Sequence, residues 1–432
     1  MDGGFETMIT AALIKQVIAD QQEEQLPRDC FHRATESKLK KLAQNQEIIV
    51  LTGVRRCGKS VLLNMLRQDL KEKDYFFNFE DERLVGFTVE HFQLLYEVFL
   101  EVFGEQKTFY FDEIQNIPGW EMFVRRLYNA GNKIFITGSN ATLFSEELGT
   151  RLTGRYIQLN IYPFSFSEYL QHELPGIAEK KIVSTKESSQ IKKLFNQYCQ
   201  FGGIPEYAKN RESDYLQFLY ESIIYRDIVS RYKITHADTL KKMVFFLASN
   251  CSKETTYNSL KKYLELGSAT TVSDYCGYLE TSYLCFFLNR YHRSVKTQNQ
   301  SPKKIYFIDH ALAKIVGFHF SDDAGRLLEN IVFIELKRRY TQIYYHNEKK
   351  ECDFIIQENI TVILAIQVCQ SLSNESTKQR ELAGLLDALE THDLKEGFIL
   401  TESEEKTEII LKDSKRYTVR IMPIWKWLRS EN

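Results

Sequence analysis

Short apolar runs alternate with amphipathic stretches over the first 140 residues, and this pattern predicts the elements of that part. The apolar runs are rich in β-branched and aromatic side chains, which is typical of buried strands. These strands are expected at residues 48–51, 75–79, 108–113 and 133–139. The intervening stretches have helical spacing and predict helices at 61–66, 90–103 and 119–130, preceded by two more at 8–25 and 34–45. Strands that alternate with helices predict an α/β fold with a parallel sheet and helices on both faces.

The pattern changes after about residue 162. Residues 190–260 are rich in helical spacing, which is interrupted by Gly-Gly-Ile-Pro at 202–205. Residues 255–288 contain a helix, a turn at Gly267 and a second helix over about 270–288, which fits a helix-turn-helix. From residue 304 strands return, and they are expected at 304–309, 342–346, 353–357, 362–368, 397–401 and 419–423, with helices at 324–339 and 376–391. This last region predicts a separate α/β unit.

Composition sets the class of protein without indicating a partner. A chain of 432 residues is expected to form two or three domains. Its 56 basic and 58 acidic residues give a net charge of -2, which is no global sign of nucleic-acid binding but permits a local basic surface. The eight cysteines form no C-x-x-C pair, so we expect free thiols in a reducing compartment. No run of 18 apolar residues and no secretory signal occurs, so we expect a cytoplasmic chain without a membrane span.

A glycine-rich loop follows the first predicted strand of the sheet. Gly53, Gly58, Lys59 and Ser60 match the phosphate-binding pattern G-x-x-x-x-G-K-[ST], or Walker A, and a helix follows directly. Backbone N–H groups of such a loop and the helix N-terminus bind phosphate. Lys59 is expected to reach the β- and γ-phosphates, and Ser60 to bind Mg²⁺. The loop residues expected to contact ATP are Gly53, Val54, Arg55, Arg56, Cys57, Gly58, Lys59, Ser60 and Val61.

Two carboxylates end a later strand, in the arrangement known as Walker B. Asp112 is expected to hold Mg²⁺, which needs only one or two carboxylates beside phosphate and water. Glu113 is expected to polarise the attacking water. Ser139 or Asn140, after the next strand, is placed to sense the γ-phosphate, and the alternative is an N-cap of the following segment.

Several cations near these motifs have two interpretations each. Arg151 and Arg155 are candidates for an arginine finger that stabilises charge during phosphoryl transfer, and the alternative is a solvated ion pair. Arg55 and Arg56 either add charge near the phosphates or face a partner.

Cys57 lies beside a helix N-terminus, where a thiol can be redox-sensitive, but a small filler side chain is favoured.

Several segments together resemble the prokaryotic AAA-superfamily ATPases that carry a C-terminal, restriction-endonuclease-like domain of unknown function. The resemblance rests on residues 51–60, 111–115, 118–120, 136–141, 162–169, 202–206, 225–228 and 351–354. It implies ATP and Mg²⁺ as ligands more firmly than it implies a biological role. The implied organisation is an N-terminal helical segment (1–30), a P-loop ATPase core (31–165), a helical lid or linker (166–235), a winged helix-turn-helix (236–303) and a restriction-endonuclease-like domain (304–432).

The implied winged helix leaves DNA and protein open as partners. Its second helix exposes Ser273 and Asp274 and carries few cations. The basic residues and the histidine nearby lie just outside that helix, at Lys261, Lys262, Arg290, His292, Arg293 and Lys296. Cations beside a helix-turn-helix favour contact with DNA phosphates, whereas their absence from the helix favours docking of a protein.

A nuclease of the restriction-endonuclease type needs an acidic residue on a helix, an Asp on a strand and then Glu-x-Lys on the next strand. Glu329 and Asp353 fit the first two positions. The third element has Gln367 and Cys369 instead of the carboxylate and the amine. We therefore expect this domain to bind without metal-dependent cleavage.

The leading interpretation is a Mg²⁺-dependent ATPase that couples hydrolysis to a DNA-associated or partner-binding conformational change. The alternative is a slow nucleotide-dependent switch that docks a protein without binding DNA. An arginine finger acting between copies would also require a homo-oligomer.

Overall fold

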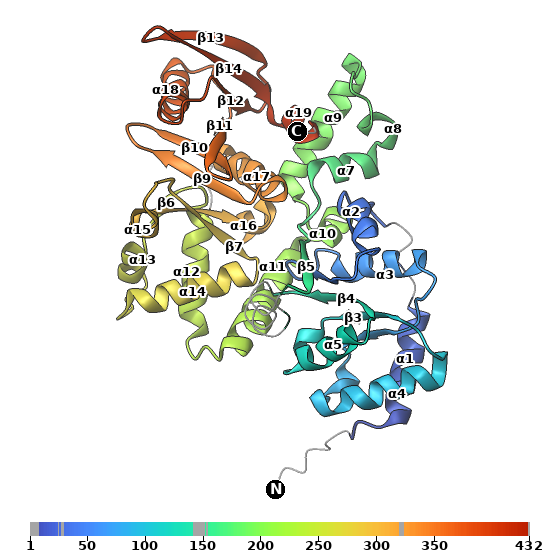
Figure 1. Ribbon diagram of the computed structural model, residues 1–432. Helices are drawn as coiled ribbons and strands as arrows, with labels where there is room; N and C mark the ends of the chain where they lie inside the picture. The colour runs from blue at the N-terminus through green and yellow to red at the C-terminus, as the bar shows by residue number, and fades with distance from the viewer. Residues whose placement is uncertain are drawn as a thin grey trace. The chain divides into compact units, whose positions relative to one another are not determined.

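The structure is a computed structural model that describes residues 8–24, 26, 30–140, 152, 154–318 and 324–430. The chain divides into two compact units, Met1–Tyr162 and Pro163–Asn432 (Figure 1). Among the helices in the described ranges, none is long and apolar enough to cross a membrane.

Unit 1 is built on a parallel sheet of five strands in the order β2-β3-β4-β1-β5. The strands are β1 (Ile48–Thr52), β2 (Phe76–Asn78), β3 (Thr108–Asp112), β4 (Lys133–Gly138) and β5 (Tyr156–Asn160). The helices are α1 (Ala11–Glu23), α2 (Thr35–Leu42), α3 (Lys59–Asp69), α4 (Phe92–Phe103) and α5 (Trp120–Asn129), with short 3₁₀ turns η1 (Glu82–Leu84), η2 (Val89–His91) and η3 (Ile114–Asn116). The predicted α/β class and parallel sheet are confirmed.

Helices cover both faces of this sheet. Successive residues of a strand point to opposite faces, so each strand contributes side chains to both. One face packs Phe109, Phe111 and Ile134 against apolar residues of α1, α4 and α5, in a core rich in phenylalanine. The other face carries Phe76, over which the Arg67 guanidinium of α3 lies at 4.3 Å. In Figure 1, α3 and the group of α1, α4 and α5 lie on opposite sides of β3 and β4.

Helix α1 is an integral part of unit 1. It begins at Thr10, whose side chain caps the helix by accepting a hydrogen bond from Leu13 N at 3.2 Å. Gln21 is buried and pairs with edge strand β2, accepting from Asn78 N at 2.9 Å and donating to Asn78 O at 3.1 Å. These bonds satisfy backbone groups that an edge strand otherwise exposes.

Unit 2 begins with helices and then forms two sheets. The early helices are α7 (Phe166–Glu173), α8 (Pro175–Ala178), α9 (Thr185–Phe201), α10 (Pro205–Asn210) and α11 (Ser213–Ser222), which continues as a π-helix, η5 (Ile223–Ser230). The C-terminal helix α19 (Ile424–Arg429) packs on α7, where Ser167 Oγ donates to Leu428 O at 2.8 Å. The last residues of the chain that are described thus stabilise the first helix of the unit.

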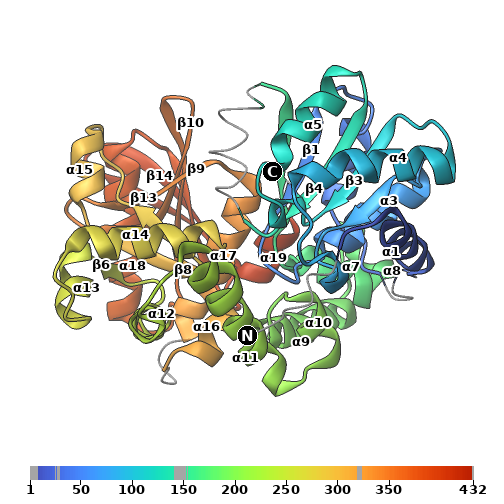
Figure 2. The same cartoon turned by 90° about the horizontal axis from the view of Figure 1, so that it is seen from below.

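The smaller sheet of unit 2 has three antiparallel strands in the order β6-β8-β7. The strands are β6 (Glu254–Thr255), β7 (Cys285–Asn289) and β8 (Lys303–Phe307), and the helices around them are α12 (Ala237–Ser249), α13 (Tyr257–Tyr263), α14 (Ala269–Thr281) and α15 (Val295–Gln300) (Figure 2). The domain boundary expected between residues 303 and 304 falls inside β8.

The helix expected over residues 270–288 is wrong in its second part. Helix α14 ends at Thr281, and β7 begins four residues later. Tyr283 has a φ of 60°, a left-handed conformation that cannot continue an α-helix. The apolar residues at 285–288 therefore pair with β8 as a strand.

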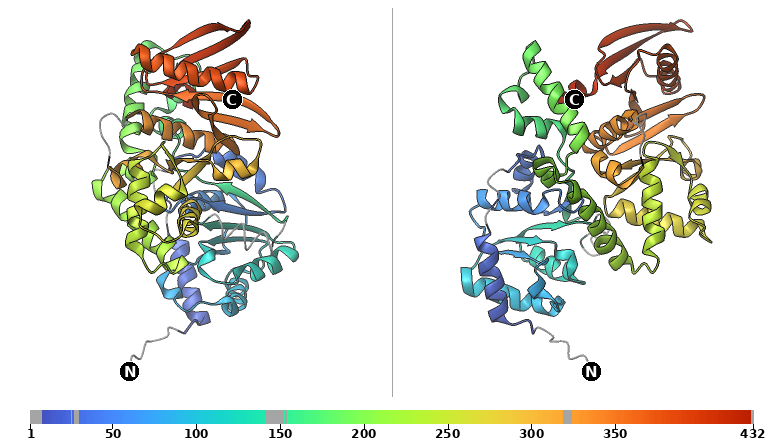
Figure 3. Two further views of the ribbon diagram at one scale, coloured as in Figure 1. Left: turned by 90° about the vertical axis from the view of Figure 1, so that its left-hand side faces the viewer. Right: turned by 180° about the vertical axis from the view of Figure 1, so that it is seen from behind.

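The larger sheet has six strands in the order β13-β14-β12-β11-β10-β9, with parallel pairing of β11, β12 and β14 and antiparallel pairing elsewhere. Its strands are β9 (Gln342–Asn347), β10 (Glu351–Glu358), β11 (Thr361–Val368), β12 (Glu396–Thr401), β13 (Lys406–Lys412) and β14 (Lys415–Pro423). Helix α18 (Glu375–Thr391) packs on β10, β11 and β12 (Figure 3). Helices α16 (His310–Val316) and α17 (Ala324–Arg339) connect the two sheets along the chain.

Candidate nucleotide-binding site

The phosphate loop lies between the carboxyl end of β1 and the start of α3, as the sequence predicts. Gly53 has a φ of +154°, and a Cβ at this position would lie 2.1 Å from the Ile161 carbonyl oxygen. Gly58 has a φ of +95° directly before the helix. Only glycine fits both the approach at residue 53 and the turn at residue 58 without strain.

The Lys59 side chain folds back over the loop. Its ammonium donates to the carbonyl oxygens of Gly53 and Val54, at 3.1 and 3.2 Å. It also lies 3.6 Å from Glu113 Oε1. Lys59 is only 4% exposed, so its charge acts in a medium less polarisable than water.

Asp112 joins the phosphate loop to the third strand of the sheet. Its Oδ1 accepts a hydrogen bond from Ser60 Oγ at 3.0 Å and a second one from Thr137 Oγ1. Strand β4 lies between β1 and β3, so Thr137 reaches Asp112 from the neighbouring strand. A serine hydroxyl beside a carboxylate is an oxygen donor pair of the kind that Mg²⁺ takes together with phosphate and water. These residues fit the predicted Mg²⁺ site.

Glu113 occupies a strained turn at the end of β3. Its φ of 50° lies in the left-handed region, which residues with a side chain adopt rarely and often at functional sites. Its backbone N donates to Thr137 Oγ1 at 3.1 Å, and its carboxylate accepts a hydrogen bond from Gln115 Nε2. The turn directs the Glu113 carboxylate toward Lys59 rather than along the strand.

The electrostatics of Asp112 follow from its burial. Burial raises the pKa of Asp112 to about 6, and the neighbouring Glu113 charge acts in the same direction. Hydrogen bonds from Thr137 and Ser60 and the charge of Lys59 oppose that rise. A divalent cation would remove the cost of the ionised form, so this carboxylate is suited to binding one.

Arg33, which sequence reasoning missed, holds the phosphate loop from behind. Its guanidinium donates to Cys57 O at 2.9 Å and to Tyr162 O at 2.5 Å. The contacts join residues 24 and 129 positions apart, for which no local pattern in the sequence gives a signal. The residue is almost completely buried.

The remaining side chains of the phosphate loop lie in different surroundings. Arg55 forms an ion pair with Glu80 at 2.8 Å, and Arg56 is exposed with a φ of 63°. Cys57 is buried, and burial raises the pKa of its thiol, which agrees with the favoured reading as a filler. Val61 is half-buried in the first turn of α3.

The remaining predicted residues lie at different distances from the phosphate loop. Ser139 and Asn140 are buried after β4, next to the carboxyl ends of β1 and β3. Arg155 precedes β5, whose Tyr156 pairs with Ile48 at the amino end of β1. Since a strand rises about 3.3 Å per residue, Arg155 lies roughly 15 Å from the phosphate-loop end of the sheet. Arg151 lies outside the described residues.

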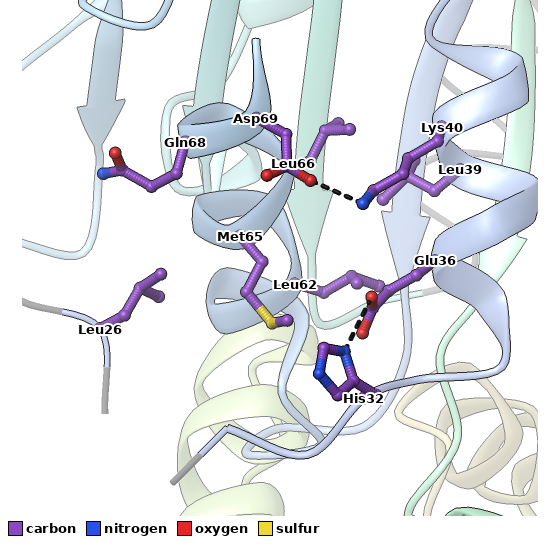
Figure 4. A pocket seen from close by; sticks show the side chains of 10 residues that line it. All are labelled: Leu26, His32, Glu36, Leu39, Lys40, Leu62, Met65, Leu66, Gln68 and Asp69. Carbon is purple, nitrogen blue, oxygen red and sulfur yellow. Dashed lines mark hydrogen bonds and ion pairs between the residues drawn. The ribbon is translucent and has the colours of Figure 1, made fainter. Parts of the chain in front are cut away.

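A cavity of about 300 Å³ opens between α2 and α3 (Figure 4). Leu39 of α2 and Leu62, Met65 and Leu66 of α3 provide its apolar lining. Its polar groups include a hydrogen bond between His32 and Glu36 at 3.3 Å and an ion pair between Lys40 and Asp69 at 2.6 Å. The cavity adjoins the same helix whose first residue is Lys59.

The nuclease-type residues of unit 2 form a second polar cluster. Glu329 of α17 and Asp353 of β10 come together as predicted, and Gln367 Oε1 accepts from Asp353 N at 3.1 Å. Cys369 lies in an apolar core, where burial raises the pKa of its thiol. The sequence did not indicate Lys304, which bridges Glu329 and Asp353 at 3.1 and 2.7 Å.

Comparisons with known protein families divide the chain into three matched regions. A model described as an AAA domain matches residues 45–170. Two domains of unknown function, DUF8612 and DUF4143, match residues 192–321 and 324–427. Of the solved structures, the replication initiator DnaA bound to AMPPCP and single-stranded DNA is 14% identical and covers 60% of this chain and 93% of its own, with a TM-score of 0.28.

Two relatives match this chain over most of their own length. The protein MJ1544 of Methanocaldococcus jannaschii, described as uncharacterized, is 34% identical over 96% of this chain and 95% of its own. A Haemophilus influenzae protein, also described as uncharacterized, is 32% identical over 87% of this chain and 94% of its own. The chain therefore belongs to the AAA superfamily of P-loop ATPases, in the family that includes MJ1544.

Proposed function

We propose that this chain binds ATP with Mg²⁺ and hydrolyses it to ADP and phosphate. The observation that carries the proposal is the meeting of Ser60, Asp112 and Thr137, from three different elements, beside Lys59 and Glu113. A phosphate cradle alone needs only the loop. A carboxylate for the metal and a second carboxylate for water are what hydrolysis adds.

Each side chain has a definite part in this reaction. Lys59 leaves its carbonyl partners to contact the β- and γ-phosphate oxygens. Ser60 and Asp112 would hold the Mg²⁺, which would neutralise charge at the phosphates. Glu113 orients the attacking water and accepts its proton as the oxygen bonds to the γ-phosphorus and the bond to ADP breaks. Ser139 and Asn140 are proposed to hydrogen-bond the γ-phosphate.

The α2–α3 cavity is proposed as the site of the nucleobase. It has the size of small-molecule sites, an apolar lining and a polar rim. Leu62 lines it only two residues after Ser60, on the helix that receives the phosphates. Arg33 supports both sites, since it precedes α2 and bonds the loop at Cys57.

Two substitutions test this proposal in the whole chain. Lys59→Ala is expected to abolish nucleotide binding, and Glu113→Gln to retain ATP without turnover. The matched controls are Lys107→Ala and Glu105→Gln, which alter an exposed ion pair of unit 1. Unchanged hydrolysis in both site variants would contradict the assignment.

A second candidate function is a nucleotide-dependent switch that docks a protein partner. The order of α12, β6, α13, α14, β7 and β8 resembles that of a winged helix, in which α14 would take the place of the recognition helix. The sequence of α14 contains Asp274 and Glu280 but no lysine or arginine. Its Tyr278 also stacks on Tyr232, at 3.8 Å between ring centroids. An acidic, partly covered helix favours a protein partner over the phosphates of DNA.

ATP turnover measured with and without duplex DNA distinguishes a DNA-associated ATPase from a protein-docking switch. Stimulation that falls steeply with salt supports a DNA-associated ATPase. Unchanged turnover supports the docking switch.

Because Arg155 lies far from the phosphate loop, an arginine finger from this position is proposed to act between copies of the chain.

A further inference from the structure

A buried lysine lies at the centre of the carboxylate cluster in unit 2. Lys304 of β8 is 1% exposed, and its ammonium contacts Glu351 at 2.6 Å, Asp353 at 2.7 Å and Glu329 at 3.1 Å. The three carboxylates come from α17 and β10, whereas the lysine comes from the three-stranded sheet. The cluster therefore joins elements far apart in the sequence.

The ammonium donates hydrogen bonds to Glu329 and Asp353 and forms an ion pair with Glu351. A lysine ammonium has three donors and no acceptor, and three oxygens surround it here. Burial lowers the pKa of Lys304, but Asp353 and Glu329 raise it by more, so the net pKa lies well above its usual value. A charged amine that is held by three carboxylates acts as a counter-ion, whereas a catalytic amine needs a free donor or lone pair for substrate.

Asp353 and Glu329 also accept hydrogen bonds from other groups of the protein. Asp353 Oδ1 takes the Lys304 bond, and Asp353 Oδ2 accepts from Val368 N at 2.9 Å. Glu329 Oε1 accepts from Lys304 at 3.1 Å and from the Tyr306 hydroxyl at 2.5 Å. A metal ion at this point would have to displace Lys304 from both acids.

The position expected to carry a metal-binding glutamate is also internally paired. Gln367 donates through Nε2 to Glu381 Oε2, and Glu381 also pairs with Arg380 at 2.6 Å. Position 369 lacks the expected amine and position 367 lacks the expected carboxylate. Lys304 and Glu381, from other places in the sequence, provide an amine and a carboxylate at this cluster. Both are bonded to groups of the chain itself.

We propose that Lys304 is the resident cation of this centre, in the place that a divalent metal would otherwise occupy between Glu329 and Asp353. The cluster then holds no metal ion, and its ion pairs join the three-stranded sheet to the six-stranded sheet. Neighbouring hydrogen bonds join the same two parts of the unit. Asn330 of α17 accepts from Phe307 N at 2.7 Å and donates to Phe307 O at 2.9 Å, and Tyr345 of β9 donates to Pro302 O at 2.6 Å.

Thermal unfolding of the full chain tests the lysine. Lys304→Met leaves buried carboxylates without a counter-ion and is expected to lower the melting temperature by roughly 10 °C. Lys304→Met with Asp353→Asn is expected to recover most of that loss, because the second change removes the uncompensated charge. Lys303→Met, next to it on β8, is the matched control, since the Lys303 ammonium donates to the Asn289 amide oxygen and lies 5.9 Å from the centre of the Tyr257 ring.

Metal binding tests the same proposal from the other side. In a chain with Asp112→Asn, which silences the nucleotide site, millimolar Mn²⁺ is expected to give no bound signal in electron paramagnetic resonance. A stoichiometric Mn²⁺ signal that Asp353→Asn removes would overturn the proposal, as would a Lys304→Met chain as stable as wild type. If Lys304→Met does not fold, recovery in the double variant supports the proposal and failure of the double variant overturns it.

Discussion

Ser60 Oγ donates a 3.0 Å hydrogen bond to Asp112 Oδ1, although 52 positions separate the two residues. One residue ends the phosphate loop, and the other ends the strand β3, which is not a neighbour of β1 in the sheet. Thr137 of the intervening strand bonds the same oxygen. The sheet order thus brings the phosphate-binding and acidic ends together without any direct pairing of their strands.

Asp112→Asn is expected to stabilise the chain near pH 7.5 in the absence of nucleotide and metal. The pKa of Asp112 is raised from 3.8 to about 6 by burial, so the folded state binds its proton more tightly than the unfolded state does. The free energy of unfolding from this group is therefore greatest below about pH 4 and falls as pH rises through about 6. A shift of this size corresponds to about 3 kcal/mol at neutral pH.

Urea unfolding at pH 4 and pH 7.5 measures this difference. Asparagine removes the ionisable group, so the gain should appear at pH 7.5 and vanish at pH 4. The exposed Asp69→Asn is the control. Greater stability of wild type at pH 7.5 would mean that Lys59 already compensates the charge of Asp112.

Arg33→Ala is expected to loosen the phosphate loop. The change leaves the buried carbonyl oxygens of Cys57 and Tyr162 without this donor, at a cost of about 2–4 kcal/mol in the free energy of unfolding. ATP affinity should fall as well, because the loop loses its support. Urea unfolding and nucleotide titration measure both effects, and Arg125→Ala, at an exposed position outside the site, serves as control. An unchanged affinity would show that the loop holds its shape without Arg33.

The parts of the site that are local in sequence could be predicted from it. The strand, the glycines and the lysine of the loop are consecutive, and Asp112 and Glu113 directly follow an apolar run. Arg33 could not be found, because its partners lie 24 and 129 positions away. Thr137 left a weak signal, as a polar residue inside an apolar strand, but only the sheet order shows that it faces Asp112.

The fold of unit 2 shows a different limit. A short apolar run such as residues 285–288 is compatible with either a helix or a strand, and the partner strand β8 decides between them. Lys304 likewise appeared as one polar residue at the start of a strand. Its role depends on Glu329 and Asp353, which follow it by 25 and 49 positions.

Met65→Trp is expected to weaken ATP binding by filling the α2–α3 cavity. A nucleobase excluded from an apolar cavity loses at least roughly tenfold in affinity, or about 1.4 kcal/mol. Inhibition by inorganic triphosphate, which has no base, should be unchanged. Met122→Trp, at an exposed methionine of unit 1, is the control. Equal loss for ATP and triphosphate would mean that the substitution disturbs the phosphate loop instead.

Arg155→Ala is expected to leave ATP affinity unchanged, because the residue lies at the amino end of β5, away from the phosphate loop. If it acts as a finger between copies, its loss should lower turnover only at concentrations where the chain self-associates. Mixing Arg155→Ala with Glu113→Gln then tests the geometry, since one variant keeps an intact site and the other an intact finger. Recovered turnover in the mixture supports action between copies. Loss of turnover in the dilute Arg155→Ala chain, with no recovery on mixing, would place its effect within one copy, and Arg125→Ala controls for removal of an exposed cation.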